Sequence, residues 1–219
     1  LKTSMYMTSS DTLATKKVVI YAPKAVILSE DRRKLLLIIA NKIADEYLNR
    51  EKVNLNFICT HNSRRSQIAQ VWAFYAREYF GLKNIFTFSG GTETTAFHRN
   101  TVKTLQKIGF KFHVVNFSHQ NPRYLISFEG TNKSILGFSK VFNDTNNAYP
   151  YIAITTCNNA DENCPFIPDV LERFHLPFKD PKTSDGTVVQ NETYLKTNQQ
   201  IAAEIFCIFK DVKNIIEKK

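Results

Sequence analysis

The chain has 219 residues, of which 43% are hydrophobic and 12% aromatic, and this is enough apolar surface for a packed core. Its 29 basic and 20 acidic side chains give a formal charge of +9, which favours anionic partners. The basic residues are scattered, and the longest apolar run, 35–40, is far shorter than the roughly 20 residues of a membrane helix, so we expect neither nucleic-acid binding nor a membrane span.

The first 50 residues are predicted to form an N-terminal extension with one amphipathic helix at 29–50. Ser29 can cap the start of this helix, and the acidic residues Glu30 and Asp31 suit the positive end of its dipole. Apolar side chains recur on one face at helical spacing: Leu36, Ile39, Ile43 and Tyr47. A short apolar run at 18–21, either a strand or an extended arm, precedes the helix.

Residues 1–15 lack the basic start and apolar stretch of a secretory signal, so we expect a cytoplasmic protein. The four cysteines, at 59, 157, 164 and 207, are too few for a disulfide framework in a chain of this length. In a reducing compartment they should begin as thiols, which leaves chemistry or packing as their use. Cys207 shares an apolar helix face with Ile201, Ile205 and Ile208, so we expect it to pack.

Residues 51–219 alternate strand and helix signals and are predicted to form one α/β domain. Strands are expected at 53–58, 85–88, 151–156 and 174–178, and helices at 67–79, 100–108 and 192–216. The segments 124–128 and 134–139 are predicted to form an inserted β-hairpin. Such alternation indicates a parallel sheet covered by helices on both faces, with the ligand beyond the carboxyl ends of the strands.

At the end of the first predicted strand, five residues separate Cys59 from Arg65. A loop of this length before a helix can wrap around a tetrahedral oxyanion, and Arg65 offers a planar fork of donors that matches two oxygens of phosphate or arsenate. These positive surroundings favour the thiolate of Cys59, to which Ser66 can donate a hydrogen bond. The predicted anion-binding residues are Thr60, His61, Asn62, Ser63, Arg64, Arg65 and Ser66. The alternative is a buried cysteine beside surface arginines, but a strand before the loop and a helix after it favour the anion site.

The segment 59–67, with Ser-Gly-Gly-Thr at 89–92 and Asp180-Pro181, resembles the low-molecular-weight tyrosine phosphatase and thioredoxin-coupled arsenate reductase superfamily. The resemblance covers roughly 53–210 and implies a three-layer α/β fold whose four-stranded parallel sheet is flanked by helices. Residues 1–50 and the hairpin would be additions to a catalytic domain at 51–219.

Three positions depart from the family pattern. Arg64 stands where many members have cysteine, and His61 replaces a common glycine. Gln70 stands where some reductases carry a glutamate that helps to hold potassium, so the sequence leaves open whether a potassium ion is bound. We expect Arg64 to face solvent, and no Cys/His set has the spacing of a metal site.

The resemblance also implies roles for individual residues. Asp180 matches the family's general acid, although its segment is also rich in turn formers. Cys157 and Cys164 match the redox segment of the arsenate reductases. Cys59 would attack arsenate, Cys157 would attack the Cys59 adduct and release arsenite, and Cys164 would then attack Cys157. Thioredoxin would reduce the resulting Cys157 to Cys164 disulfide, with no bound cofactor.

Arsenate reduction and phosphomonoester hydrolysis through a phosphocysteine both remain open from the sequence, as does a binding module without turnover. Hydrolysis needs only water and Asp180, whereas arsenate reduction needs two electrons and therefore two thiols. Family phosphatases usually place aromatic residues after the Asp-Pro pair, but this chain has Lys182, Thr183, Ser184 and Asp185. A small inorganic anion is therefore favoured as substrate. The oligomeric state is left open.

Overall fold

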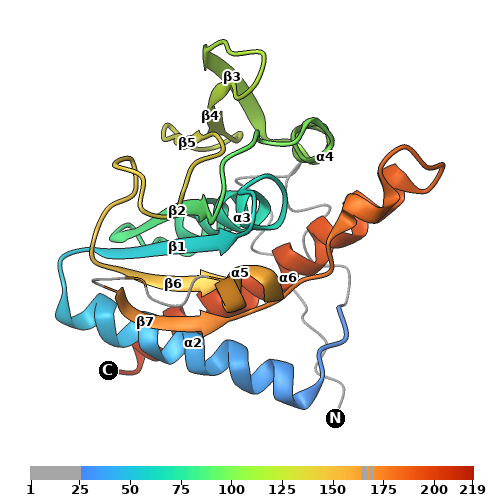
Figure 1. Cartoon of the computed structure of the whole chain (residues 1–219). Helices are drawn as coiled ribbons and strands as arrows, with labels where there is room; N and C mark the ends of the chain where they lie inside the picture. The colour runs from blue at the N-terminus through green and yellow to red at the C-terminus, as the bar shows by residue number, and fades with distance from the viewer. Residues whose placement is uncertain (1–25, 164–166, 168–169) are drawn as a thin grey trace.

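The structure is a computed structural model that describes residues 26–163, 167 and 170–219 (Figure 1). The apolar run at 18–21 and Cys164 lie outside the described residues. Two sheets are present in the described ranges, one with four strands in the order β2-β1-β6-β7 and one with three strands in the order β3-β4-β5.

The four-stranded sheet is parallel throughout and confirms the predicted fold class. Its central strand β1, Val53–Cys59, pairs with β2, Ile85–Gly91, on one side and with β6, Tyr151–Thr155, on the other. The outer strand β7, Val170–His175, pairs with β6. Because parallel strands share one carboxyl edge, Cys59 at the end of β1 lies at the edge where ligands bind in such sheets.

Helices cover the two faces of this sheet unequally (Figure 1). The larger core gathers side chains of β1 with those of α2, Glu30–Asn49, α3, Arg65–Tyr79, and α6, Gln190–Glu217. The opposite face carries the short helix α5, Asn158–Asn163, which lies next to the end of β6 in the figure. A smaller buried cluster on that face contains Ile58, Cys59 and Cys157.

The predicted N-terminal helix is present as α2, and Ser29 caps it by accepting a hydrogen bond from the backbone N–H of Arg32. Its apolar face packs into the larger core with α6. Two ion pairs join these helices, Arg32 with Glu204 at 2.8 Å and Arg33 with Asp211 at 2.6 Å. None of the helices in the described ranges contains an apolar stretch long enough to cross a membrane.

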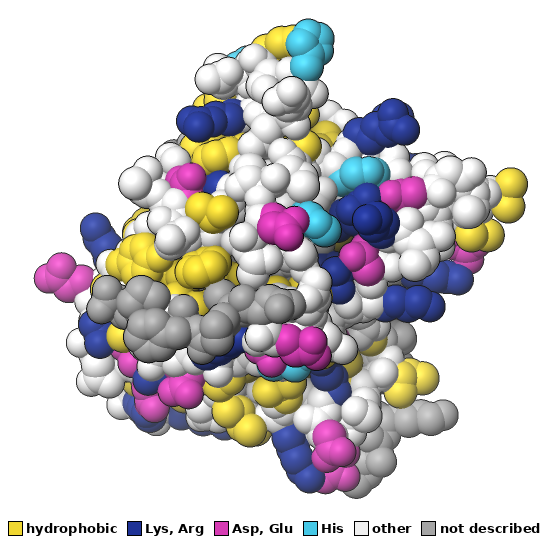
Figure 2. Space-filling model, in the orientation of Figure 1, with side chains coloured by type: hydrophobic (Ala, Val, Ile, Leu, Met, Phe, Trp, Pro, Cys, Tyr) yellow, Lys and Arg dark blue, Asp and Glu magenta, His cyan; other side chains and the backbone are white. Residues whose placement is uncertain are grey.

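The inserted hairpin is wider than predicted, because a third strand joins it. The strands β3, Lys111–Asn116, β4, Arg123–Ser127, and β5, Ile135–Gly137, pair antiparallel. They follow α4, Arg99–Ile108, and project from the body of the molecule (Figure 1). Histidine and hydrophobic side chains gather at the tip of this projection (Figure 2). The sequence analysis missed β3 because most of its side chains are exposed, so no apolar alternation marks it.

Two further boundaries differ from the predictions, and one short helix was not predicted. The last strand covers Val170–His175 rather than 174–178, because this outer strand is only half-buried and shows no continuous apolar run. The strand β2 continues to Gly91, since it stays in register with β1 up to the pair Cys59 and Gly91. The polar segment after Cys157 forms the helix α5, in which Ala160 is buried.

Candidate functional site

The segment 59–66, hereafter the anion loop, connects β1 to α3 and brings the predicted nucleophile next to a serine hydroxyl. Cys59 is 4% exposed, and its Sγ lies 2.9 Å from Ser66 Oγ. Ser66 Oγ also accepts a hydrogen bond from Asn62 Nδ2 at 2.9 Å. A thiolate has no proton to donate, so when Cys59 is ionised the Ser66 hydroxyl is the donor of this contact.

Neutral hydrogen bonds hold the sharpest bend of the anion loop from behind. Asn62 has a φ of 45°, a left-handed conformation that asparagine tolerates better than most residues. Its Oδ1 accepts from Gln67 Nε2 at 3.1 Å and from the backbone N–H of Lys140 at 3.0 Å. Gln67 Nε2 also donates to the carbonyl of Asn62 at 2.9 Å. These buried bonds hold the loop in its curved shape.

Two carbonyls of the anion loop are turned outward to donors. The carbonyl of His61 accepts from Ser139 Oγ at 2.8 Å, and that of Ser63 accepts from the backbone N–H of His98 at 3.0 Å. In a trans peptide the N–H points opposite to the carbonyl, so the N–H groups that follow are directed away from these donors. This is the orientation that an anion-binding loop requires.

The Ser-Gly-Gly-Thr motif at the end of β2 lies directly against the anion loop. A Cβ at Gly91 would lie 2.6 Å from the carbonyl oxygen of Thr60, so the close approach excludes any side chain. The backbone N–H of Thr92 donates to the carbonyl of Cys59 at 3.2 Å. Ser89 Oγ donates to Gln70 Oε1 at 2.6 Å, and Gln70 Nε2 donates to the carbonyl of Thr87 at 3.0 Å. Both ends of the Gln70 amide therefore have protein partners.

The predicted anion clamp and the predicted acid are in contact. Arg65 donates through one terminal nitrogen to Asp180 Oδ2 at 2.6 Å and through the other to the carbonyl of Phe178 at 3.1 Å. The remaining guanidinium nitrogen, Nε, has no hydrogen-bond partner among the described residues. Asp180 Oδ1 accepts from the backbone N–H of Lys182, so the carboxylate also caps the short helix η2, Pro181–Ser184. An acid is thus held beside the guanidinium at the loop.

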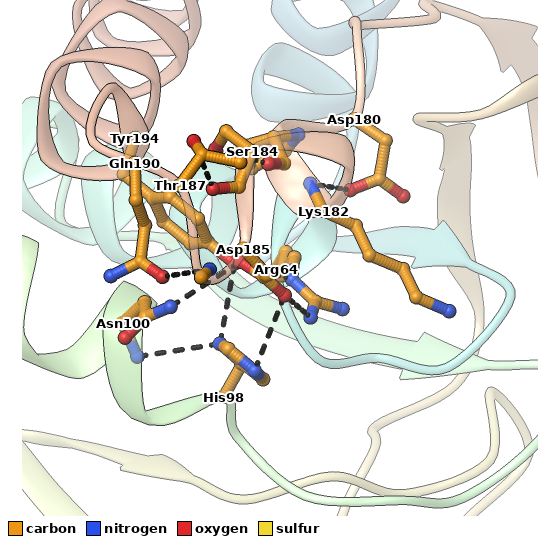
Figure 3. A network of polar contacts seen from close by, with 12 residues as sticks. Arg64, His98, Asn100, Asp180, Lys182, Ser184, Asp185, Thr187, Gln190 and Tyr194 are labelled. Carbon is orange, nitrogen blue, oxygen red and sulfur yellow. Dashed lines mark hydrogen bonds and ion pairs between the residues drawn. The ribbon is translucent and has the colours of Figure 1, made fainter.

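Arg64 does not face solvent as expected, since its side chain is only 11% exposed and joins a polar network (Figure 3). Its Nε donates to the Tyr194 hydroxyl at 2.7 Å, and a terminal nitrogen donates to Asp185 Oδ2 at 2.8 Å. The Tyr194 hydroxyl donates to the other oxygen of Asp185 at 2.7 Å. His98 and Asn100 lie next to the same carboxylate. In Figure 2, basic, acidic and histidine side chains meet in this region.

The network is electrostatically balanced at neutral pH. Burial would raise the pKa of Asp185, but hydrogen bonds from Tyr194 and Arg64 outweigh it, and the net pKa is lowered. Burial and the bond to Asp185 raise the pKa of Tyr194 to about 12. Burial and the charge of Arg64 lower the pKa of His98. One guanidinium therefore faces one carboxylate, with a neutral phenol and a neutral imidazole beside them.

The second predicted redox thiol stands beside the anion loop. Cys157 follows β6, the neighbour of β1, and its Sγ lies 3.5 Å from Thr60 Oγ1. Cys157 and Cys59 share one buried cluster. Cys207 instead lies on α6 in the larger core, where burial and the nearby Asp211 raise its thiol pKa to about 11. The third predicted redox residue, Cys164, is outside the described residues.

Some site residues could not have been found from local sequence signals. Tyr194 and Asp185 contact Arg64 across 130 and 121 positions of the chain, and neither stands in a recognisable motif. His61 is partly exposed, and its ring lies 3.4 Å from Glu93. Within the described ranges, no group of three or more His, Cys, Asp or Glu side chains is arranged to hold a metal ion.

A parallel α/β sheet whose first strand ends in a cysteine, an anion loop and an arginine defines a class of thiol-dependent oxyanion enzymes. Comparison with protein-family models gives no match. The arsenate reductase of Bacillus subtilis is 31% identical over 131 residues, which cover 60% of this chain and 76% of the relative. The arsenate reductase of Bacillus licheniformis is 30% identical over 137 residues, covering 62% and 79%.

Among solved structures, the low-molecular-weight protein tyrosine phosphatase from T. tengcongensis covers 77% of this chain and 100% of its own, at 15% identity and a TM-score of 0.47. From the identity to the Bacillus arsenate reductases, the chain belongs to the low-molecular-weight protein tyrosine phosphatase and arsenate reductase superfamily. The superfamily predicted from three motifs is thereby confirmed, and with it the prediction of an enzyme.

Proposed function

We propose that this chain reduces arsenate to arsenite with its own thiols. The observation that carries the proposal is the position of Cys157, whose Sγ lies 3.5 Å from Thr60 Oγ1 of the anion loop. Hydrolysis of a phosphocysteine would require only the loop and an acid, whereas reduction requires a second thiol near the first. The two Bacillus relatives described above are also named arsenate reductases.

In the proposed first half of the reaction, the anion loop and Arg65 bind arsenate. Arg65 would exchange its contact with Asp180, now 2.6 Å, for the anion. The thiolate of Cys59 attacks arsenic and forms an S–As bond while an As–O bond breaks. Asp180 protonates the departing oxygen, which leaves as water. The hydrogen bond from Ser66 steadies the thiolate before the attack.

In the second half, the thiolate of Cys157 attacks the sulfur of Cys59. The S–As bond breaks, its electron pair stays on arsenic, and arsenite leaves while a Cys59 to Cys157 disulfide forms. Cys164 then attacks Cys157, which releases Cys59 and leaves a Cys157 to Cys164 disulfide. Two electrons have passed from two thiols to arsenic, and an external dithiol protein of the thioredoxin type returns them.

Phosphomonoester hydrolysis is the second candidate, favoured by the position of Asp180. Its carboxylate contacts Arg65 and would serve equally as the acid for a departing alkoxide. The residues that follow do not form an aromatic wall, since Lys182 and Thr183 are exposed and polar. Lys182 extends beside Asp180 rather than into the polar network (Figure 3). A small phosphoester would therefore suit this site better than a phosphotyrosine.

Two assays on the same variants separate the candidates. One follows arsenate-dependent NADPH oxidation with thioredoxin and thioredoxin reductase, and the other follows p-nitrophenyl phosphate hydrolysis. We expect Cys157→Ser and Cys164→Ser to abolish the first activity and to leave any hydrolysis unchanged, while Cys59→Ser abolishes both. Cys207→Ser is the matched control, because this thiol lies in the larger core. Arsenate turnover that persists in Cys157→Ser would exclude the reductase mechanism.

A further inference from the structure

A cavity of about 450 Å³ lies between α3, β2 and β5. No residue of the anion loop lines it. Two residues that do line it also contact its surroundings: Gln70 donates to the carbonyl of Thr87 in β2, and the backbone N–H of Lys140 donates to Asn62 at the back of the anion loop. Its volume falls within the roughly 300–1,000 Å³ of sites that hold small organic ligands.

The charge of the cavity is one-sided. Four cationic residues line it, namely Arg77, Lys83, Lys133 and Lys140, and no Asp or Glu is among its lining residues. Glu78 lies outside the lining and contacts Arg77 at 3.2 Å and Lys133 at 3.6 Å. Asp144, also outside the lining, interacts electrostatically with Lys140. Two neighbouring carboxylates therefore balance part of the charge of four cations, and the site keeps an excess of positive charge.

Lys140 is the most unusual of these cations, because it is 3% exposed and its ammonium has no hydrogen-bond partner among the described residues. Taking an unpaired charge out of water is unfavourable, and burial accordingly lowers the pKa of this lysine to about 8. The ammonium lies 4.8 Å from the centre of the Phe138 ring, which compensates only part of the cost. An anion near this wall would stabilise the charged form.

The remaining walls of the cavity are largely aromatic. Phe74, Phe86, Phe88 and Phe138 line the cavity, and the Arg77 guanidinium lies 5.2 Å from the centre of the Phe86 ring. The outer edge of β2 does not add free carbonyls, because those of Thr87, Ser89 and Gly91 accept hydrogen bonds from Gln70, Asn147 and Phe142. Flat apolar surfaces are thus combined with cations in the cavity.

We propose that this cavity binds a small organic anion with a flat aromatic body, at a site separate from the anion loop. The phenylalanine rings would contact the faces and edges of the aromatic body. The carboxylate, sulfonate or phosphate group of the ligand would face Lys83 and Lys133 at the exposed side of the cavity. An inorganic anion would leave the aromatic walls without contact, and an uncharged aromatic compound would leave the positive charge unbalanced.

The test uses 8-anilinonaphthalene-1-sulfonate as probe, with binding measured by titration calorimetry. Saturating phosphate is present so that the anion loop is occupied, and Cys59→Ser should bind the probe as the wild type does. We expect one saturable site. The double variant Lys83→Glu/Lys133→Glu should weaken binding by about tenfold or more, because it reverses two charges at the cavity. The matched control Lys103→Glu/Lys107→Glu makes the same charge change on exposed residues of α4 and should leave binding unchanged.

A second variant and a second probe keep the test independent of folding effects. Ser134→Trp, at an exposed lining position, should fill the cavity and block binding without changing the charge. N-phenyl-1-naphthylamine, which lacks the sulfonate, should bind at least about tenfold more weakly. Absence of saturable binding, equal weakening by both double variants, or equal affinity for the uncharged probe would overturn the proposal. These outcomes do not depend on whether the anion loop turns over arsenate.

Discussion

The back and the rim of the anion loop are built from different interactions. The back consists of Asn62, Ser66 and Gln67, which are fully buried and joined by neutral hydrogen bonds. The rim consists of two ion pairs, Arg64 with Asp185 and Arg65 with Asp180, at 2.8 and 2.6 Å, whose carboxylates are partly exposed. Buried neutral bonds do not depend on ionisation, whereas ion pairs with a partly exposed carboxylate can exchange one partner for another ion. The back therefore determines shape, and the rim can change partners when an anion binds.

The largest effect is expected from Gly91→Ala, which tests the back of the loop. The new Cβ would lie 2.5 Å from the carbonyl oxygen of Glu93 and 2.6 Å from that of Thr60, both of them backbone atoms. We expect a loss of roughly 3 kcal/mol or more in the free energy of unfolding and loss of turnover. Urea unfolding measures the first. Gly186→Ala is the control, because nothing lies within 4 Å of its added Cβ and its cost is limited to the backbone strain of a φ of 77°, on the order of 1 kcal/mol. Equal losses in both variants would disprove the steric explanation.

The next effect in size concerns the two neighbouring arginines of the rim. Arg65→Lys should lower kcat/KM by about 100-fold, because lysine lacks the planar fork, while the free energy of unfolding changes by about 1 kcal/mol or less. Arg64→Lys should affect catalysis much less, since Arg64 is bound to Tyr194 and Asp185. Steady-state kinetics with arsenate or p-nitrophenyl phosphate and thermal unfolding of both variants are the measurements. Similar kinetic losses would show that the two ion pairs have one shared role.

The third prediction concerns the pH dependence of stability and the buried Lys140. The backbone N–H of this residue donates to Asn62 at the back of the anion loop, and its side chain is buried. Its pKa is about 8 in the folded state and 10.5 ordinarily, so between these values the unfolded chain binds more protons. The stability of the wild type should therefore rise from pH 8 to 10.5 relative to Lys140→Met. We expect Lys140→Met to be more stable at pH 7 by on the order of 3 kcal/mol, with the difference vanishing near pH 10.5. Urea unfolding at several pH values measures it, and a constant difference would contradict it.

The smallest effect is expected at the exposed side of the rim. The pKa of Asp185 is lowered by Tyr194 and Arg64, so its ionised form stabilises the folded state above the ordinary value of 3.8. This contribution is lost as pH falls through the lowered pKa. Asp185→Asn should therefore cost about 1 kcal/mol at pH 6, and the difference from wild type should shrink below pH 4. Urea midpoints at pH 6 and pH 3 test this. A difference that grows at low pH would have the wrong sign.

The sequence by itself determined those helices, strands and loops whose identifying residues lie within one short stretch of the chain. The apolar run into Cys59, the five residues before Arg65 and the helix that follows all lie within one short segment. The capped helix α2 was likewise predictable, because Ser29 and the acidic first turn precede a periodic apolar face. These elements follow from backbone geometry and local periodicity, and both can be recognised without knowing the fold.

Only the tertiary structure decided the contacts between distant segments. The strand β3 is stabilised by pairing with β4 rather than by burial, so its own residues carry no signal. The contact of Arg64 with Tyr194 spans 130 positions, and the cavity is formed where β5 comes close to α3 and β2. Cys157 reaches Thr60 only because β6 is the neighbour of β1. Side-chain partners of this kind depend on strand order and packing, and those are properties of the whole chain.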